Sequence, residues 1–387
     1  MIPAAPSSGR PGGLHRGVLP WALRMTYMAW VMGVLAQSAA AAAQSVVFIN
    51  PGRSDESYWT TVSEAMQDAA SSLGMQLQVR YAQRDHLRPI EIARQIAALP
   101  KAQRPRYVMF TNDYSVAPEI LRTLEAAGID SFMAFSGVPE TLRGQTGVAR
   151  ERYRHWLGSL EPGAEEAGYL TAKSLFAAAR ASGQARAADG RLHMVAIAGD
   201  RSTPSSVERN AGMRRAAAEA SDVVLQQEVF GEWRRERAEQ QAAVLFQRYP
   251  EVRLVWAGND EMAFGAMQAW RARGGSPGRD AFFSAINSSA AAMTALRTGE
   301  LSALAGGHFL TGAWALVMLY DHAHGADFAS EGLEQVRPMF TLLDKSQIDR
   351  YEHRISAPLA PLDFRSYSKH LNPRLRRYGF ELKHLLR

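Results

Sequence analysis

The sequence predicts an α/β protein made of two doubly wound parallel-sheet lobes. Three observations support this fold class: strand-like and helix-like segments alternate from residue 44 onward, the alternation occurs in two successive sets, and polar residues follow the expected strands. A chain of 387 residues suits two domains of ordinary size, and its 47% hydrophobic and 21% charged residues are typical of a globular protein. It contains no cysteine, which excludes disulfides and thiolate chemistry.

The first set of elements ends near Phe135. Pro89 stands where helices often begin, and Gly74 and Gly128 stand where helices often end. We expect strands at 45–50, 76–81, 107–111 and 131–135, separated by helices at 59–73, 89–99 and 118–127.

The second set of elements begins near Glu161, and we expect the two sets to be joined near Tyr153 to Ser159. Its expected helices are 164–179, 205–220, 236–249, 261–271 and 290–298. Its expected strands are 193–198, 223–229, 254–256 and 281–286.

Residues 1–43 have the pattern of a secretory signal peptide. Arg10, Arg16 and Arg24 precede an apolar run at 25–36, and small residues follow up to Ala43. The apolar run is shorter than the roughly 20 residues that a membrane-spanning helix needs, which favours cleavage over a retained anchor. We therefore expect an exported, periplasmic protein.

The formal net charge of +6 is concentrated at the two ends of the chain. Residues 1–43 carry three arginines and no acid, and residues 365–387 carry seven basic residues and one acid. The remainder is slightly acidic, so we expect no nucleic-acid partner. For the basic C-terminal tail, 365–387, a solvated and frayed end is expected in preference to docking on an acidic partner or a membrane.

Polar residues follow five expected strands. A single such residue usually forms a turn or a helix cap, but ligands of open parallel sheets bind beyond the carboxyl ends of the strands. Five such ends favour a shared cleft over separate turns. The residues are Asn50, Asn112-Asp113, Gly199-Asp200, Asn259-Asp260 and Asn287.

The segment from Val255 to Ala266 resembles a turn and helix of the type I periplasmic binding protein family, of the ribose- and galactose-binding sort. Its residues Asn-Asp-Glu-Met-Ala-Phe-Gly-Ala fit the family pattern Asn-Asp-x-Met-Ala-x-Gly-Ala, and further likeness lies at Glu208-Arg209-x-x-Gly212 and at 298–301. The likeness covers roughly Ser45 to Leu343. It implies two lobes joined by a three-strand hinge, with the ligand cleft between them and further crossings near His308 and Arg337.

The same resemblance implies lobe boundaries and ligand-binding residues. The N-terminal lobe would comprise 44–156 and 309–336, and the C-terminal lobe 157–308 and 337–364. Sugars offer C–H faces to aromatic rings and hydroxyls to planar donors and acceptors. The implied ligand-binding residues are Asn50, Trp59, Asp113, Arg209, Trp233, Asn259, Asp260, Asn287 and His308.

Two of these residues have simpler explanations. Trp59 could be a core residue in the first turn of a helix, and Arg209 could merely pair with Glu208. A narrower resemblance is to the periplasmic autoinducer-2 receptor, through Pro51-Gly52 followed by Tyr58-Trp59, through Arg209, and through 363–368. That receptor has an arginine where this chain has His308.

Two patterns that suggest catalysis or metal binding are explained by their surroundings. Gly274 to Gly278 fits Gly-x-Ser-x-Gly, but an expected helix precedes it and a strand follows, the reverse of a nucleophile elbow. His322 and His324 point apart on a helix, where they are expected to meet the last carbonyls.

We expect a periplasmic solute-binding protein that captures a small sugar or sugar-like ligand by hinge closure and delivers it to an ABC importer. The alternative is a soluble ligand-sensing subunit for a membrane histidine kinase. An enzyme is the least favoured class, and we expect a monomer with no catalytic residues, metal or cofactor.

Overall fold

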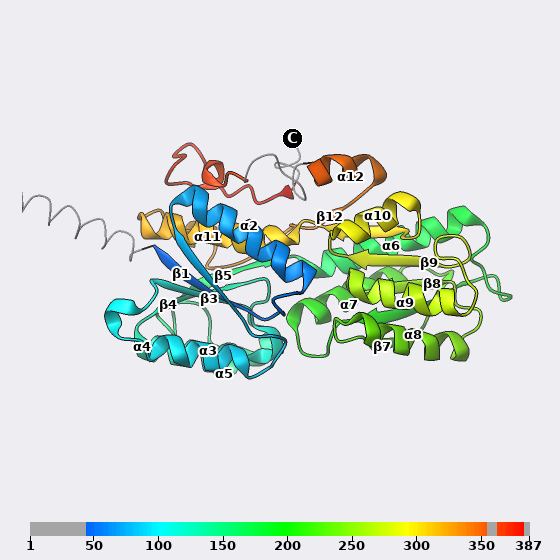
Figure 1. Ribbon diagram of the computed structural model, residues 1–387, viewed down its shortest axis with the longest axis horizontal. Helices are drawn as coiled ribbons and strands as arrows, with labels where there is room; N and C mark the ends of the chain where they lie inside the picture. Colours follow the sequence, from blue (N-terminus) through cyan, green and yellow to red (C-terminus); the bar gives the residue numbers. More distant parts are fainter. Residues whose placement is uncertain (1–43, 354–361, 383–387) are drawn as a thin grey trace, which may run out of the picture. The chain divides into compact units, whose positions relative to one another are not determined.

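The computed structural model describes residues 44–353 and 362–382, so the expected signal peptide at 1–43 lies outside the described part. The described strands form two six-stranded sheets (Figure 1). Those of the first sheet are β1 (Ser45–Asn50), β2 (Gln76–Tyr81), β3 (Tyr107–Phe110), β4 (Asp130–Ala134), β5 (Trp156–Pro162) and β11 (Glu334–Arg337). Those of the second are β6 (Leu192–Ala198), β7 (Val223–Phe230), β8 (Leu254–Ala257), β9 (Phe282–Ile286), β10 (Ala303–Gly306) and β12 (Thr341–Leu342).

The two sheets have corresponding strand orders. They are β11-β5-β4-β3-β1-β2 in the first sheet and β12-β10-β9-β8-β6-β7 in the second. All pairs are parallel except β10 with β12. The predicted doubly wound α/β fold class is therefore confirmed.

Helices cover both faces of each sheet (Figure 1). The first sheet is flanked by α2 (Ser57–Leu73), α3 (Arg88–Ala97), α4 (Ala117–Ala127) and α11 (Thr311–Ala323), and the short α5 (Arg143–Thr146) precedes β5. The second is flanked by α6 (Ala164–Ser182), α7 (Pro204–Ala218), α8 (Arg235–Arg248), α9 (Asp260–Ala272) and α10 (Ala290–Thr298), and α12 (Lys345–Tyr351) packs beside α10.

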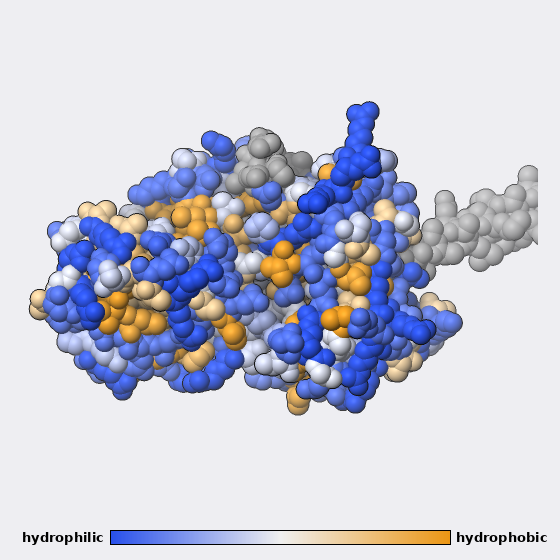
Figure 2. All heavy atoms as spheres, turned by 180° about the vertical axis from the view of Figure 1, so that it is seen from behind, coloured by the Kyte–Doolittle hydropathy of each residue, from blue (hydrophilic) through white to orange (hydrophobic). Residues whose placement is uncertain are grey.

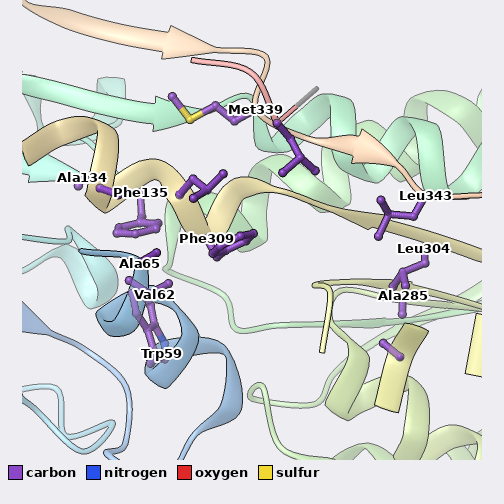
Figure 3. Close-up of a cluster of buried hydrophobic side chains, with 14 of the residues drawn as sticks. Trp59, Val62, Ala65, Ala134, Phe135, Ala285, Leu304, Phe309, Met339 and Leu343 are labelled. Atoms are coloured by element: carbon purple, nitrogen blue, oxygen red, sulfur yellow. The ribbon is translucent and has the colours of Figure 1, made fainter. Parts of the chain in front are cut away.

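Strand β1 shows why the sheets are buried on both faces. Its alternate residues Val46 and Phe48 join one hydrophobic cluster, whereas Val47 and Ile49 join another. Successive side chains of a strand point to opposite faces, so an uninterrupted apolar run requires a helical layer on each side. One cluster of buried side chains continues from the first sheet into the second. Figure 3 shows part of it, from Trp59 at one end to Leu343 and Ala285 at the other.

The described chain passes between the sheets three times. It leaves the first sheet after Pro162, returns between β10 and α11, and crosses again between β11 and β12. The first crossing lies a few residues beyond the expected junction at Tyr153 to Ser159, because β5 pairs within the first sheet. The later crossings contain or adjoin His308 and Arg337, where recrossing was expected. The lobe boundaries themselves stay a prediction.

The C-terminal segment corrects one expectation. Residues 362–382 are not a frayed end: Phe364, Tyr367, Tyr378 and Phe380 are buried, and the Phe380 ring stacks on Trp314 of α11 at 5.4 Å. Apolar and aromatic residues spaced among the basic ones supply this packing, which a count of charges overlooks.

The surface shown in Figure 2 is mostly hydrophilic, with hydrophobic residues in small separate groups. None of the helices in the described part combines the length and apolarity that a membrane crossing requires.

Candidate functional site

Loops after the strands of both sheets line a shared inner cavity. In each sheet the strand order reverses beside its first strand, between β1 and β3 and between β6 and β8. Ligands of open α/β sheets bind outside the carboxyl ends of the strands at such a point. The inner cavity, of about 50 Å³, lies there. It is lined by Glu56, Tyr58, Trp59, Arg84, Asp113, Phe135, Ser136, Pro162, Thr203, Ser205, Arg209, Trp233, Asn259, Asn287 and His308.

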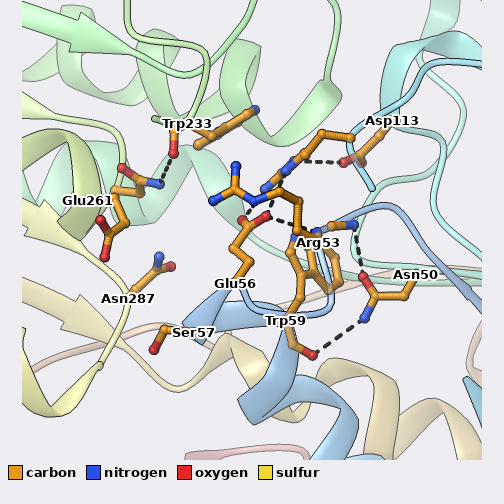
Figure 4. Close-up of polar contacts among 12 residues, drawn as sticks. Asn50, Arg53, Glu56, Ser57, Trp59, Asp113, Trp233, Glu261 and Asn287 are labelled. Carbon is orange, nitrogen blue, oxygen red and sulfur yellow. Dashed lines mark hydrogen bonds and ion pairs between the residues drawn. The ribbon is translucent and has the colours of Figure 1, made fainter. Parts of the chain in front are cut away.

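The structure brings seven of the nine expected residues together around the inner cavity. Figure 4 shows side chains from both sheets converging, with Glu56, Trp59 and Asp113 on one side and Trp233 and Asn287 on the other. Asn50 and Asp260 do not line the cavity but support residues that do.

Asn50 positions the loop that carries Trp59. Its Oδ1 accepts a hydrogen bond from the Gly52 amide at 2.9 Å, and its Nδ2 donates to the Trp59 carbonyl at 3.4 Å and to Ser63 at 3.3 Å. All its polar atoms therefore serve the β1–α2 loop. The side chain is a turn former at the end of the strand, the simpler of the two explanations considered for such residues.

Asp260, at the start of α9, likewise supports a residue of the cavity wall. Its Oδ1 accepts a hydrogen bond from Asn287 Nδ2 at 2.9 Å, which orients Asn287 at the cavity. Asn259 caps α9, because its Oδ1 accepts from the Met262 amide at 2.8 Å. Asn259 therefore combines a capping bond with a place in the cavity wall.

Arg209 is a buried cation without a carboxylate partner. It is 5% exposed, and within the described residues no salt bridge joins it to Glu208 or any other acid. One terminal nitrogen donates to the Gly258 carbonyl at 2.7 Å and the other contacts His308 Nε2 at 3.1 Å, while Nε has no partner. Burial lowers the pKa of Arg209 to about 10, so the guanidinium stays charged at neutral pH. A buried charge of this kind favours a ligand that supplies acceptors.

The His308 ring is neutral and offers one N–H group as a hydrogen-bond donor. Burial, reinforced by the charge of Arg209, places its pKa well below the ordinary value. Because an arginine can only donate, Nε2 accepts the bond from Arg209 and the proton of the neutral ring resides on Nδ1, which has no partner. The ring is stacked between Tyr58 at 4.8 Å and Phe340 at 4.3 Å. His308 thus presents a fixed N–H in an aromatic sandwich.

Each sheet contributes one tryptophan that lies against a glycine. A Cβ on Gly52 would come within 2.0 Å of the Trp59 ring, and one on Gly199 within 2.2 Å of the Trp233 ring. Trp233 is fixed by a 2.7 Å hydrogen bond from Nε1 to Asp200. Trp59 is 5% exposed and packs in the core, yet it also lines the cavity, and its Nε1 has no partner.

The expected site residues did not include an arginine–carboxylate network at the cavity. Arg84 donates from Nε to Glu56 at 3.0 Å and lies 3.9 Å from Asp113. Arg84 follows β2, so the strand-end rule could have found it. Glu56 and Tyr58 come from the loop and first turn after β1, and only the fold reveals their neighbours.

Left-handed backbone is concentrated in these loops. Eight of the nine non-glycine residues with positive φ in the described part follow strand ends, and four of them, Arg84, Phe135, Trp233 and Asn287, line the cavity. Such conformations each cost on the order of 1–3 kcal/mol and cluster at functional sites. The strain supports a binding role for these loops.

The two misleading patterns are explained by the structure. Residues 274–278 lie between α9 and β9, which is a helix-to-strand loop as expected. His324 Nδ1 lies 2.8 Å from the Tyr320 carbonyl near the end of α11, also as expected, whereas His322 instead contacts the Tyr107 hydroxyl at 3.0 Å.

Comparisons with known proteins agree with this geometry. The family described as "Periplasmic binding protein domain" matches residues 46–327, and no curated protein matches the chain. A solved periplasmic sugar-binding protein from Pseudomonas fluorescens is 40% identical, with a TM-score of 0.80, and the match covers 89% of this chain and 100% of that one.

Two further solved structures share the fold at lower identity. An ABC transporter solute-binding protein from Actinobacillus succinogenes with bound D-allose is 17% identical, with a TM-score of 0.67, covering 79% of this chain and 99% of that one. One from Bacillus halodurans with bound myo-inositol is 18% identical, with a TM-score of 0.64, covering 80% and 98%. With the family match spanning most of the chain, the chain belongs to the periplasmic binding protein family.

Proposed function

We propose that this protein is an exported solute-binding protein that captures a small sugar or sugar-like polyol between its two sheets and delivers it to an ABC importer. Family membership supports binding without chemical turnover, and the 40% identical relative is described as a sugar-binding protein. The solute-binding proteins with D-allose and myo-inositol are described as parts of ABC transporters, which supports the importer as partner. Export and cleavage of residues 1–43 remain part of the proposal.

The observation that carries the proposal is a set of unpaired buried donors around the cavity. Within the described part of the chain, Trp59 Nε1, Arg209 Nε and His308 Nδ1 each lack a hydrogen-bond partner, although buried N–H groups are normally satisfied. Ring and hydroxyl oxygens of a sugar would accept from them. Asp113 and Glu56 would accept from hydroxyl hydrogens, and Trp233 would cover an apolar C–H face.

Closure of the two sheets on the ligand is expected because the ligand-binding groups come from different parts of the fold. Asp113 follows β3 of the first sheet, Arg209 lies on α7 beside the second, and His308 lies in a crossing segment between them. A ligand that binds all three would favour the arrangement in which the sheets approach, because ligands shift populations toward the state that they bind better.

The experiment is a thermal-shift screen followed by calorimetric titration. The panel contains D-ribose, L-arabinose, D-glucose, D-galactose, D-allose, myo-inositol and autoinducer-2. A ligand at 100 times its Kd stabilises the folded state by about 2.7 kcal/mol, so a hit should raise the melting temperature by a few degrees. Inclusion of autoinducer-2 tests the narrower resemblance, which stays a prediction.

Two variants identify the cavity as the binding site. Arg209→Met keeps an unbranched side chain but removes the N–H donors and the cation–π contacts with Trp233 and Phe340, and should weaken binding at least roughly tenfold. Gly199→Ala should displace Trp233 and also weaken binding. Arg122→Met, on the exposed face of α4, is the matched control and should bind normally. No shift across the panel for a folded protein would refute the sugar class; a hit insensitive to Arg209→Met would place binding elsewhere.

A further inference from the structure

A second hollow adjoins the inner cavity and shares two of its walls. This outer vestibule has a volume of about 590 Å³, more than ten times the 50 Å³ of the inner cavity. Arg84 and Trp233 line both spaces, so they frame the boundary between them. A ligand seated in the inner cavity would have its outward side next to the vestibule.

The vestibule presents aromatic surfaces from both sheets. On the side of the first sheet, the His86 ring stacks on Tyr114 with centroids 3.7 Å apart and an interplanar angle of 19°. On the side of the second sheet, Phe230 and Trp233 line the space. Aromatic faces on two sides fit a flat group with C–H edges or faces, such as a further sugar ring.

Among the charged side chains of the vestibule, the guanidinium of Arg201 is available to a ligand. The Asp200 carboxylate is occupied by Ser202, Thr203 and Trp233, and Glu232 pairs with Arg234. Arg201 lies over the Phe230 ring at 4.2 Å, and within residues 44–353 and 362–382 its guanidinium has neither a hydrogen bond nor an ion pair. An arginine above an aromatic ring supplies N–H donors for sugar hydroxyl oxygens beside an apolar surface, the combination that a sugar ring uses.

Three of the loops that carry these groups contain the same strained feature, a pair of consecutive residues with left-handed backbone. Consecutive left-handed pairs occur at Gln83-Arg84 after β2, at Tyr114-Ser115 after β3 and at Glu232-Trp233 after β7. Each pair places at least one side chain in the vestibule wall. Strain of this kind persists where the surroundings hold a functional geometry, and here three strand ends contribute it to the same hollow.

We propose that the outer vestibule is a second ligand subsite and that the natural ligand is a glycoside of two rings, one in the inner cavity and one in the vestibule, between the His86–Tyr114 pair and the Arg201–Phe230 pair. This inference rests on the proposed sugar-binding function and extends it from a single ring to a larger ligand class. The Arg84–Trp233 boundary is where the linkage between the rings would lie.

The test compares each monosaccharide with glycosides that contain it, by calorimetric titration of the purified protein. The probes are D-glucose with maltose, cellobiose and phenyl glucoside, and D-galactose with lactose, melibiose and phenyl galactoside. For the sugar that the inner cavity accepts, at least one two-ring glycoside should bind about tenfold or more tightly than the monosaccharide, because it adds one stacked ring and its hydrogen bonds.

Variants of the vestibule should remove this advantage selectively. Tyr114→Asn deletes the ring while asparagine tolerates the left-handed backbone at φ 60°, and His86→Ala deletes its stacking partner. Each should weaken the glycoside roughly three- to tenfold and leave the monosaccharide unchanged. Leu87→Ala is the matched control, since Leu87 neighbours His86, is 67% exposed and lines neither space.

The outcomes separate this inference from the proposed function. Monosaccharide binding with equal or weaker binding of all glycosides would overturn the second subsite and leave the sugar-binding function intact. An advantage for a glycoside that survives Tyr114→Asn and His86→Ala would also overturn it. If no monosaccharide or glycoside binds to the folded protein, both proposals fall together.

Discussion

Asp113 follows β3 at the inner cavity, where 5% of its surface is exposed and the Arg84 guanidinium lies 3.9 Å away. Burial raises the pKa of its carboxyl to about 6; the charge of Asp200 adds to this, and Arg84 opposes it. A carboxylate kept in such surroundings is costly to the free protein. It is nevertheless the acceptor that a sugar hydroxyl requires.

We therefore predict that Asp113→Asn stabilises the ligand-free protein at pH 7.5. Because the folded-state pKa lies above the ordinary value, the favourable contribution of Asp113 is present below about pH 4 and is lost as the pH rises through about 6. Removal of the charge should raise the free energy of unfolding by on the order of 2 kcal/mol at pH 7.5, measured by urea denaturation.

The pH dependence provides the control for Asp113. At pH 4 the difference between the two proteins should largely disappear, because the folded protein then carries a neutral Asp113. The same variant should bind sugar more weakly at pH 7.5. An Asp113→Asn protein that is less stable at both pH values would show that the ion pair with Arg84 outweighs burial.

At the scale of elements, the C-terminal segment at 362–382 depends on one buried carboxylate. Asp321 of α11 is fully buried and accepts hydrogen bonds from the Ser368 hydroxyl, the Lys369 and His370 amides and the Tyr378 hydroxyl. Four donors on a single acidic group tie the segment to α11.

We predict that Asp321→Asn destabilises the protein by roughly 2–4 kcal/mol. The amide replaces an acceptor by a donor that faces other donors, so several buried groups lose their partners. Urea denaturation measures the loss, and hydrogen exchange should show faster opening of 362–382 than of β1. Asp363→Asn is the control, because among the described residues Asp363 pairs with the exposed Arg365 alone, and the substitution should change stability by less than about 0.5 kcal/mol. Equal effects of the two substitutions would contradict the anchoring role of Asp321.

Elements with strong local signals could be predicted from the sequence. The bounds of β1, β2 and α10 match the expectation, and the cap glycines Gly74 and Gly128 are left-handed as required. Strand β10 was not anticipated, because Ala303–Gly306 contains no β-branched or aromatic residue. The end of helix α11 was expected near His322 and His324, but its start was not, because a helix buried on nearly all sides lacks an amphipathic period.

Site residues that directly follow strands could be predicted from the sequence. Contacts between side chains far apart in the sequence could not. Asp113, Asn259 and Asn287 lie at the cavity as their positions suggested. Asn50 has the same strand-end signal, but its polar atoms are used by its own turn. Arg84 follows a strand end and could have been found there, but its pairing with Glu56, 28 residues away, is visible only in the fold.

At the scale of the whole molecule, the crossing segments and the C-terminal segment limit how the sheets can move. The chain crosses three times within the described part, and near one crossing Gly307 is left-handed at φ 106°. A Cβ there would lie 2.8 Å from the Met339 carbonyl of another crossing and 3.1 Å from Leu382 of the C-terminal segment. Motion is therefore expected as rotation about this packed region and not as separation of the sheets.

We predict that a bound sugar reduces the radius of gyration, measured by small-angle X-ray scattering at saturating ligand. The physical reason is that Asp113 follows β3 of the first sheet, whereas Arg209 lies on α7 beside the second, so a ligand bonded to both favours the approach of the two sheets. Arg209→Met should abolish the change at the same ligand concentration, whereas Arg122→Met should preserve it. A sugar that binds by calorimetry without altering the scattering would mean that the sheets already occupy their ligand-bound arrangement, and recognition would then require only that the ligand enter past Arg84 and Trp233.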